Sequence, residues 1–204
     1  MSCRRKGRFS LVRRGDSRYG MERFPTGTRG GGIAVKGGGA VTETGILYGG
    51  YRPGVIGMIT RLHAVYYHDH WGFDIRFETQ VGRELSEFLR DFAEGRDFFR
   101  TARDGDRFAG SVAVDGKQAS SDGARLRWFI VAPDFQGQGV GRRLLREAVG
   151  FCRQAGYRRV HLWTFRGLDT ARALYESEGF RLTREHAARP WGPDIVEQRF
   201  DLEG

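Results

Sequence analysis

Apolar positions fall into regular repeats from residue 46 to the end of the chain. Four segments place them every three or four residues, which is the spacing of an amphipathic helix. These segments are residues 56–66, 77–92, 139–155 and 170–178. Other runs alternate or are continuously apolar, as in strands with one or two covered faces. They are residues 46–51, 98–102, 108–114, 124–132, 158–165, 180–185 and 195–202.

Turn residues separate these segments. Asp104-Gly105-Asp106 lies between two strands and predicts a hairpin, and Pro133 ends the central strand. The second helix is expected to end near Gly95. The element order βααβββαβαββ predicts an α/β fold with a mixed central sheet of about six to seven strands, flanked by about four helices.

Residues 1–44 differ from the rest, because they combine arginines with glycine runs and show almost no apolar periodicity. Such a segment buries too little to offset its chain entropy, so we predict a disordered, basic, glycine-rich tail followed by one domain over residues 45–204. A dispensable translated leader, with Met21 as a later start, and an arm that contacts nucleic acid are both open interpretations of the tail.

The net charge of +9 is concentrated in that tail, which holds ten of the 34 Lys/Arg residues and three of the 25 Asp/Glu residues. The remaining 24 basic and 22 acidic residues make the predicted domain nearly neutral. This balance argues against nucleic acid as the main partner. No run approaches the roughly 20 apolar residues of a membrane span, so a cytoplasmic protein without a membrane partner is predicted.

A glycine-rich turn joins the central strand to the third helix within Val131–Leu145. Gly137, Gly139 and Gly141 would let the main chain approach a phosphate closely, and the helix N-terminus adds unpaired N–H groups and partial positive charge. Arg142 adds a cationic side chain. The pattern predicts a cofactor that carries a diphosphate.

The type of motif narrows the cofactor. The Walker A pattern is absent, and the dinucleotide pattern G-x-G-x-x-G fails because Leu144 stands at its last position. Gln136-Gly-Gln-Gly139-Val-Gly141 fits Q/R-x-x-G-x-G/A and closely resembles the signature of the GNAT superfamily of acyltransferases. The resemblance covers roughly residues 46–202 and includes Leu168–Phe180, which is similar to the superfamily's N-x-x-A-x-x-L-Y-x-x-x-G-F motif.

Asp169 stands where that motif often has Asn, and we expect it to cap the fourth helix. More narrowly, Tyr51–Gly57, His63–Tyr67 and Trp191–Gln198 resemble the acetyltransferase half of bacterial MarR–GNAT fusion proteins. The segment 1–44 does not match the winged-helix half of such fusions.

The resemblance implies acetyl-CoA, or another short acyl-CoA, as cosubstrate and direct transfer of the acyl group to an amine in a ternary complex. It also implies that Tyr175 is the general acid that protonates the leaving thiolate, although a packing tyrosine is the competing interpretation. The implied cofactor-binding residues are Phe129, Ile130, Val131, Gln136, Gly137, Gln138, Gly139, Val140, Gly141 and Arg142.

The general base stays open, because residues 124–132 contain no Asp or Glu where several relatives carry one. Waters, or a residue of the first two helices, could take this role, and His63 and His161 are either bases or core residues. By resemblance, the acceptor pocket would involve His63, Tyr67, Trp71, Trp128 and Trp191, with Phe73 nearby. His68-Asp69-His70 lacks a distant fourth ligand, so no metal site is predicted.

Together these observations predict an acyl-CoA-dependent N-acyltransferase that acts on a primary amine, either a small molecule or an amine of a peptide or protein. The alternative is a non-catalytic module that binds acyl-CoA for regulation. A homodimer is compatible with the sequence.

Overall fold

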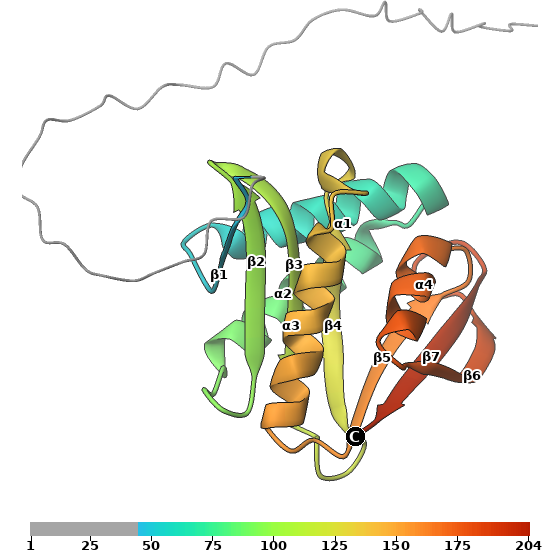
Figure 1. Ribbon diagram of the computed structural model, residues 1–204. Helices are drawn as coiled ribbons and strands as arrows, with labels where there is room; N and C mark the ends of the chain where they lie inside the picture. The colour runs from blue at the N-terminus through green and yellow to red at the C-terminus, as the bar shows by residue number, and fades with distance from the viewer. Residues whose placement is uncertain (1–44) are drawn as a thin grey trace, which may run out of the picture. The chain divides into compact units, whose positions relative to one another are not determined.

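A computed structural model describes residues 45–204, and the predicted tail over residues 1–44 lies outside the described residues. Seven strands and four helices follow one another in the predicted order, with one added 3-10 turn after the central strand (Figure 1). Their bounds are β1 (Leu47–Gly49), α1 (Val55–Trp71), α2 (Ile75–Arg90), β2 (Phe98–Asp104), β3 (Arg107–Asp115), β4 (Ala124–Val131), η1 (Pro133–Phe135), α3 (Val140–Gln154), β5 (Arg159–Phe165), α4 (Asp169–Ser177), β6 (Arg181–Ala188) and β7 (Ile195–Glu203).

The seven strands form one mixed sheet in the order β1-β2-β3-β4-β5-β7-β6. All neighbours are antiparallel except β4 and β5, which are parallel and connected through α3. Helices α3 and α4 lie on one face of the sheet, and α1 and α2 lie on the other (Figure 1). The predicted α/β class and the predicted numbers of strands and helices are therefore confirmed.

Two hydrophobic cores hold these layers together. On the α3 side, Leu144, Leu145 and Cys152 are fully buried against the sheet, which confirms the apolar face expected for this helix. On the other side, Ile59 of α1 and Leu85 of α2 pack in a second cluster. Among residues 45–204, no helix is both long enough and apolar enough to cross a lipid bilayer.

A bulge interrupts β4 at Trp128. Ser111 is paired with Ile130 and Ala113 with Arg127, so β4 contributes one residue more than β3 between the two pairs. Trp128 has φ of 45°, a left-handed conformation that costs a residue with a side chain about 1 kcal/mol or more. Its carbonyl accepts a hydrogen bond from the buried Ser111 hydroxyl at 2.8 Å. This bond gives the Trp128 carbonyl a partner, although Trp128 has no partner residue in the β3–β4 pairing.

Strand β4 separates from β5 just before this bulge. The two strands pair only from Ala124 to Leu126, opposite Val160 to Leu162. On its other edge, β5 pairs with β7 along its whole length, from Arg159 to Phe165. From Arg127 to Val131, β4 thus has a neighbouring strand on its β3 side only, and a gap opens within the sheet.

Two boundaries differ from the sequence predictions. Helix α2 ends at Arg90 rather than near Gly95. The carboxylate of Asp97 accepts a hydrogen bond from the backbone N–H of Ala93 at 2.9 Å, a local bond that competes with helix continuation. The prediction that Asp169 caps α4 is wrong by one position: Leu168 is the N-cap, and Asp169 lies in the first turn without a capping hydrogen bond.

We expect Ser111→Ala to lower the free energy of unfolding by about 1–3 kcal/mol, because the buried carbonyl of Trp128 would lose its partner. Ser121→Ala is the matched control: its exposed hydroxyl bonds the Gln118 carbonyl at 3.2 Å. Urea denaturation of both variants measures the difference. A Ser111→Ala protein as stable as the Ser121→Ala protein would show that the hydroxyl does not hold the bulge.

Candidate active site

The glycine-rich loop between η1 and α3 exposes its main chain. Gly137 and Gly139 have φ of 73° and 81°, and a Cβ added at either would meet no atom within 4 Å. The first backbone hydrogen bond of α3 joins the N–H of Arg143 to the carbonyl of Gly139 at 3.0 Å. The N–H groups of the first turn before Arg143 therefore have no acceptor within the helix and can bind an anion.

Other residues of the loop fix its position against β4. A Cβ at Gly141 would lie 3.3 Å from Val131 and 3.4 Å from Phe129, so glycine lets α3 begin close to the strand. The Gln136 side-chain amide donates to the Val131 carbonyl at 3.1 Å. Among the described residues Arg142 is exposed and forms no ion pair, so it is available beside the loop.

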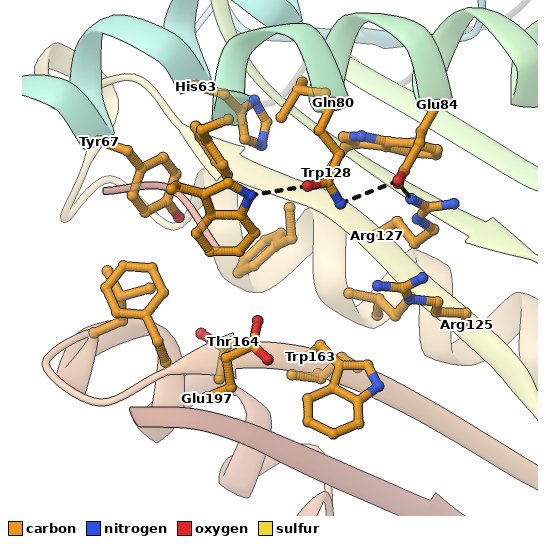
Figure 2. A pocket seen from close by; sticks show the side chains of 18 of the residues that line it. His63, Tyr67, Gln80, Glu84, Arg125, Arg127, Trp128, Trp163, Thr164 and Glu197 are labelled. Carbon is orange, nitrogen blue, oxygen red and sulfur yellow. Dashed lines mark hydrogen bonds and ion pairs between the residues drawn. The ribbon is translucent and has the colours of Figure 1, made fainter. Parts of the chain in front are cut away.

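A cavity of about 430 Å³ lies where β4 and β5 separate (Figure 2). Its walls come from α1, α2, β4, β5, α4 and the β6–β7 pair, which are far apart in the sequence. Its lining is aromatic in one part and charged in another. The lining residues are His63, Tyr67, Phe77, Gln80, Val81, Glu84, Arg125, Leu126, Arg127, Trp128, Phe129, Leu162, Trp163, Thr164, Phe165, Leu168, Tyr175, His186, Trp191 and Glu197.

Tyr175 reaches this cavity from α4. Its ring lies 5.7 Å from Phe129 and 6.2 Å from both Phe180 and Phe200, measured between centroids, and it is 6% exposed. Burial, together with the nearby Tyr67 phenol, raises the pKa of Tyr175 well above its ordinary value. The phenol is therefore neutral and carries its proton at the cavity wall.

His63 and Tyr67 lie one turn apart on α1 and also face the cavity. The Nδ1 atom of His63 lies 2.9 Å from the Ile59 carbonyl oxygen. A carbonyl oxygen can only accept a hydrogen bond, so Nδ1 carries the proton of the neutral ring and Nε2 is unprotonated. Burial lowers the pKa of His63 to about 4, and it raises the pKa of Tyr67. Both side chains are neutral at pH 7.

A chain of polar contacts closes one side of the cavity (Figure 2). Trp191 donates its indole N–H to Gln80 at 2.8 Å, and the Gln80 amide donates to Glu84 at 3.0 Å. Glu84 forms an ion pair with Arg127. The loop before β7, helix α2 and strand β4 are thus connected through side chains.

Glu197 of β7 lies across the cavity from α2. It pairs in register with Phe165 and forms a 3.2 Å ion pair with His186 when that histidine is protonated. Neither the Glu197 carboxylate nor the polar groups of α2 and β4 were predicted as site residues. A signal was present on β4, since Arg125 and Arg127 are unexpected in a central strand between two helical layers.

The predicted acceptor residues are only partly brought together. His63, Tyr67, Trp128 and Trp191 line the cavity, whereas Trp71 and Phe73 are not among its lining residues and pack against Phe165 at 5.3 and 5.2 Å. His161 is buried on β5 and is not among the lining residues; its Nε2 lies 3.5 Å from Asp122.

His68, Asp69 and His70 lie at the exposed end of α1. Within residues 45–204 no cluster of three or more His, Cys, Asp or Glu side chains is placed to bind a metal ion.

Comparisons with known proteins agree with this arrangement. The profile of the Acetyltransferase (GNAT) family matches residues 61–180. The chain is 32% identical over 118 residues to the N-alpha-acetyltransferase RimI of Mycobacterium tuberculosis, covering 56% of this chain and 72% of that protein.

Two solved structures are also similar. A protein assigned to the GNAT family from Desulfovibrio desulfuricans superposes with a TM-score of 0.61 at 25% identity, over 78% of this chain and 98% of that one. A protein assigned as an acetyltransferase of Salmonella typhimurium, solved with its cofactor acetyl-CoA, superposes with a TM-score of 0.55 at 16% identity, over 78% and 94%.

The fold and the open loop define an acetyltransferase of the α/β class. The chain belongs to the GNAT family of N-acetyltransferases, as its sequence motifs implied.

Acidification should destabilise the protein partly through His63. Its folded pKa of about 4 lies below the unfolded value of about 6.5, so the unfolded chain binds the proton more tightly and stability falls as pH drops through this window. We expect this residue to account for a loss of about 2 kcal/mol by pH 5.

The measurement compares urea denaturation at pH 7.5 and pH 5.0 for the wild type and His63→Asn, which can keep the bond to Ile59 without titrating. His70→Asn, which alters a similar bond to Tyr66 on an exposed helix end, is the control. An unchanged pH dependence in His63→Asn would contradict the assignment.

Proposed function

We propose that this protein transfers an acyl group, most simply acetyl from acetyl-CoA, to a primary amine by direct attack in a ternary complex. The observation that carries the proposal is the position of Phe129. Its ring lies beside Gly141 of the glycine-rich loop, 3.4 Å from where a Cβ would stand, and it also lines the cavity beside Tyr175. A diphosphate at the loop and a reactive group in the cavity can therefore belong to one cofactor.

The loop would hold the cofactor pyrophosphate. Gly137 and Gly139 leave space for it, and the first N–H groups of α3 provide donors with a favourable dipole. The full set of residues proposed to bind the cofactor is the predicted one: Phe129, Ile130 and Val131 of β4, and Gln136, Gly137, Gln138, Gly139, Val140, Gly141 and Arg142 of the loop and the start of α3. Within that set, the Gln136 side chain bonds Val131, so its support is indirect.

The separated half of β4 would bind the acyl-bearing arm through its main chain. Because β5 pairs with β4 only up to Leu126, the strand edge from Arg127 to Val131 is free of β5 and can donate to a thioester carbonyl. Such hydrogen bonds polarise the carbonyl and stabilise the negative charge that develops on its oxygen during attack.

Tyr175 is proposed as the general acid. Its buried phenol is neutral and can donate a proton to the thiolate that leaves when the amine attacks. A thiolate in the same apolar surroundings is destabilised as well, so burial does not remove the driving force for this transfer.

Glu197 is proposed as the group that accepts the proton of the attacking amine, directly or through water. It is a carboxylate at the cavity wall and lies on β7, outside the first helices where the sequence led us to look. His63 is a weaker candidate, because a proton on its Nε2 would create a positive charge on a buried side chain, whereas a proton on the Glu197 carboxylate neutralises a charge.

The narrower resemblance to MarR–GNAT fusion proteins stays a prediction, because the match to the GNAT family does not test it. The cytoplasmic location predicted from the sequence and a homodimer likewise remain predictions. A non-catalytic acyl-CoA-binding module would share the loop but would have no use for a protonated phenol at the cavity wall.

We expect acetyl-CoA to raise the melting temperature of the wild type but not of Gly139→Asp, whose carboxylate would face the pyrophosphate. Gly156→Asp is the matched control. Gly156 has φ of 71° and equally open surroundings, but it follows the far end of α3. The two variants share charge and backbone strain, so equal stabilisation of both by acetyl-CoA would contradict the assignment of the loop.

Acetyl-CoA and a panel of primary amines should give free thiol with the wild type. Tyr175→Phe should lower kcat by about 10²- to 10⁴-fold on the best amine while cofactor binding persists. Tyr157→Phe is the control, because its hydroxyl bonds the Arg96 carbonyl outside the cavity. If Tyr175→Phe keeps kcat within about threefold where chemistry is rate-limiting, the phenol only packs.

A further inference from the structure

Arg125 is a charged residue of the cavity that no neighbour neutralises. It lies on β4 in the half that still pairs with β5, and its guanidinium faces the cavity below Arg127 and across from Trp163 (Figure 2). Among residues 45–204 it forms no ion pair, and its Nε is buried without a hydrogen-bond partner. A buried guanidinium with unmet donors is costly unless something binds it.

The nearby carboxylates are already engaged with other arginines. Glu84 and Asp115 both pair with Arg127, the latter at 3.6 Å. Asp122 pairs with Arg199 at 2.9 Å. All three attract Arg125 from a distance, but burial and the adjacent Arg127 lower the pKa of its guanidinium.

Within the part of the chain that the structure describes, the remaining walls around Arg125 offer no further anion. His161, its register partner on β5, is uncharged or cationic, and Trp163 and Thr164 follow on the same strand. On the other side of the cavity, Glu197 supplies negative charge near Phe165. The cavity therefore has a cationic end at Arg125 and an anionic group at Glu197.

From this arrangement we infer that the acceptor is a small primary amine that also carries a carboxylate, which Arg125 binds. This inference rests on the proposed acyl transfer at the same cavity. The planar guanidinium can bind a carboxylate through two parallel hydrogen bonds, and a volume of about 430 Å³ suits a small molecule. The amine would lie toward Glu197 and Tyr175, so that both ends of an amino acid meet opposite charge.

The test compares acetyl transfer to α-amino and ω-amino acids with transfer to their carboxamides, which keep the amine and lose the anion. The wild type should prefer the acids in kcat/KM. Arg125→Gln should raise KM for the acids by about 10- to 100-fold, the range of a lost charge-assisted bond, and leave KM for the amides within about threefold. Arg125→Lys should keep part of the preference.

Arg181→Gln is the matched control, because it removes an exposed positive charge of β6 outside the cavity. The ratio of acid to amide in kcat/KM should then remain that of the wild type.

Turnover of amines with no preference for acids in the wild type, or a preference that survives in Arg125→Gln, would overturn the inference and leave the proposed function intact. Absence of thiol release with every amine would count against acyl transfer itself. In that case calorimetric binding of the same acids, with CoA present, still decides the role of Arg125. If the wild type binds the acids and Arg125→Gln does not, the role is supported. If Arg125→Gln binds them as well, or if the wild type does not bind them, the role is refuted.

Discussion

The left-handed backbone at Trp128 determines where a site can form in this sheet. A regular β4 would pair with β5 along its whole length and would present arginine and tryptophan side chains to alternate faces. The extra residue instead lies directly after the point where β4 stops pairing with β5, at Leu126, and the strand from there on has an edge that is free of β5. The Ser111 hydroxyl makes this strained conformation tolerable by bonding the Trp128 carbonyl. The cavity and the open strand edge are thus consequences of one bulge.

The same bulge changes the register of side chains along β4. Arg127 and Trp128 are consecutive, yet both belong to the α2 side: the Arg127 guanidinium lies 4.1 Å from the centre of the Trp128 ring, and Trp128 packs on Phe88. Phe129 then packs with the core under α3. One strand therefore supplies a charged lining on one side and packs beside the glycine-rich loop on the other, and the bulge keeps the consecutive residues Arg127 and Trp128 on the same side.

Much of the fold could be predicted from the sequence, because apolar periodicity is a local signal and every element it indicated exists. The glycine loop could also be predicted, since its function depends on consecutive residues. The ends of elements were harder: α2 stops at Arg90 because Asp97 competes for the Ala93 N–H, a contact that apolar spacing cannot show. Gln80, Glu84 and Glu197 occupy polar positions of amphipathic elements, which look like solvated faces until the sheet is known to separate beside them. Only Arg125 and Arg127 carried a local signal, as charges in a strand covered on both sides.

The distribution of charge inside the cavity bears on how an amine becomes reactive there. His63 and Tyr175 are buried and Tyr67 is partly buried; all three side chains are neutral, and desolvation is the main cause of their shifted pKa values. The same burial disfavours an ammonium group, so an amine that enters among these residues gives up its proton more easily than it does in water. In the proposed reaction the Glu197 carboxylate at the wall can then suffice, and a carboxylate on β4 is not required. An arginine can accordingly occupy that strand without abolishing the proposed proton transfer, and it would give the site a positive charge to position the substrate.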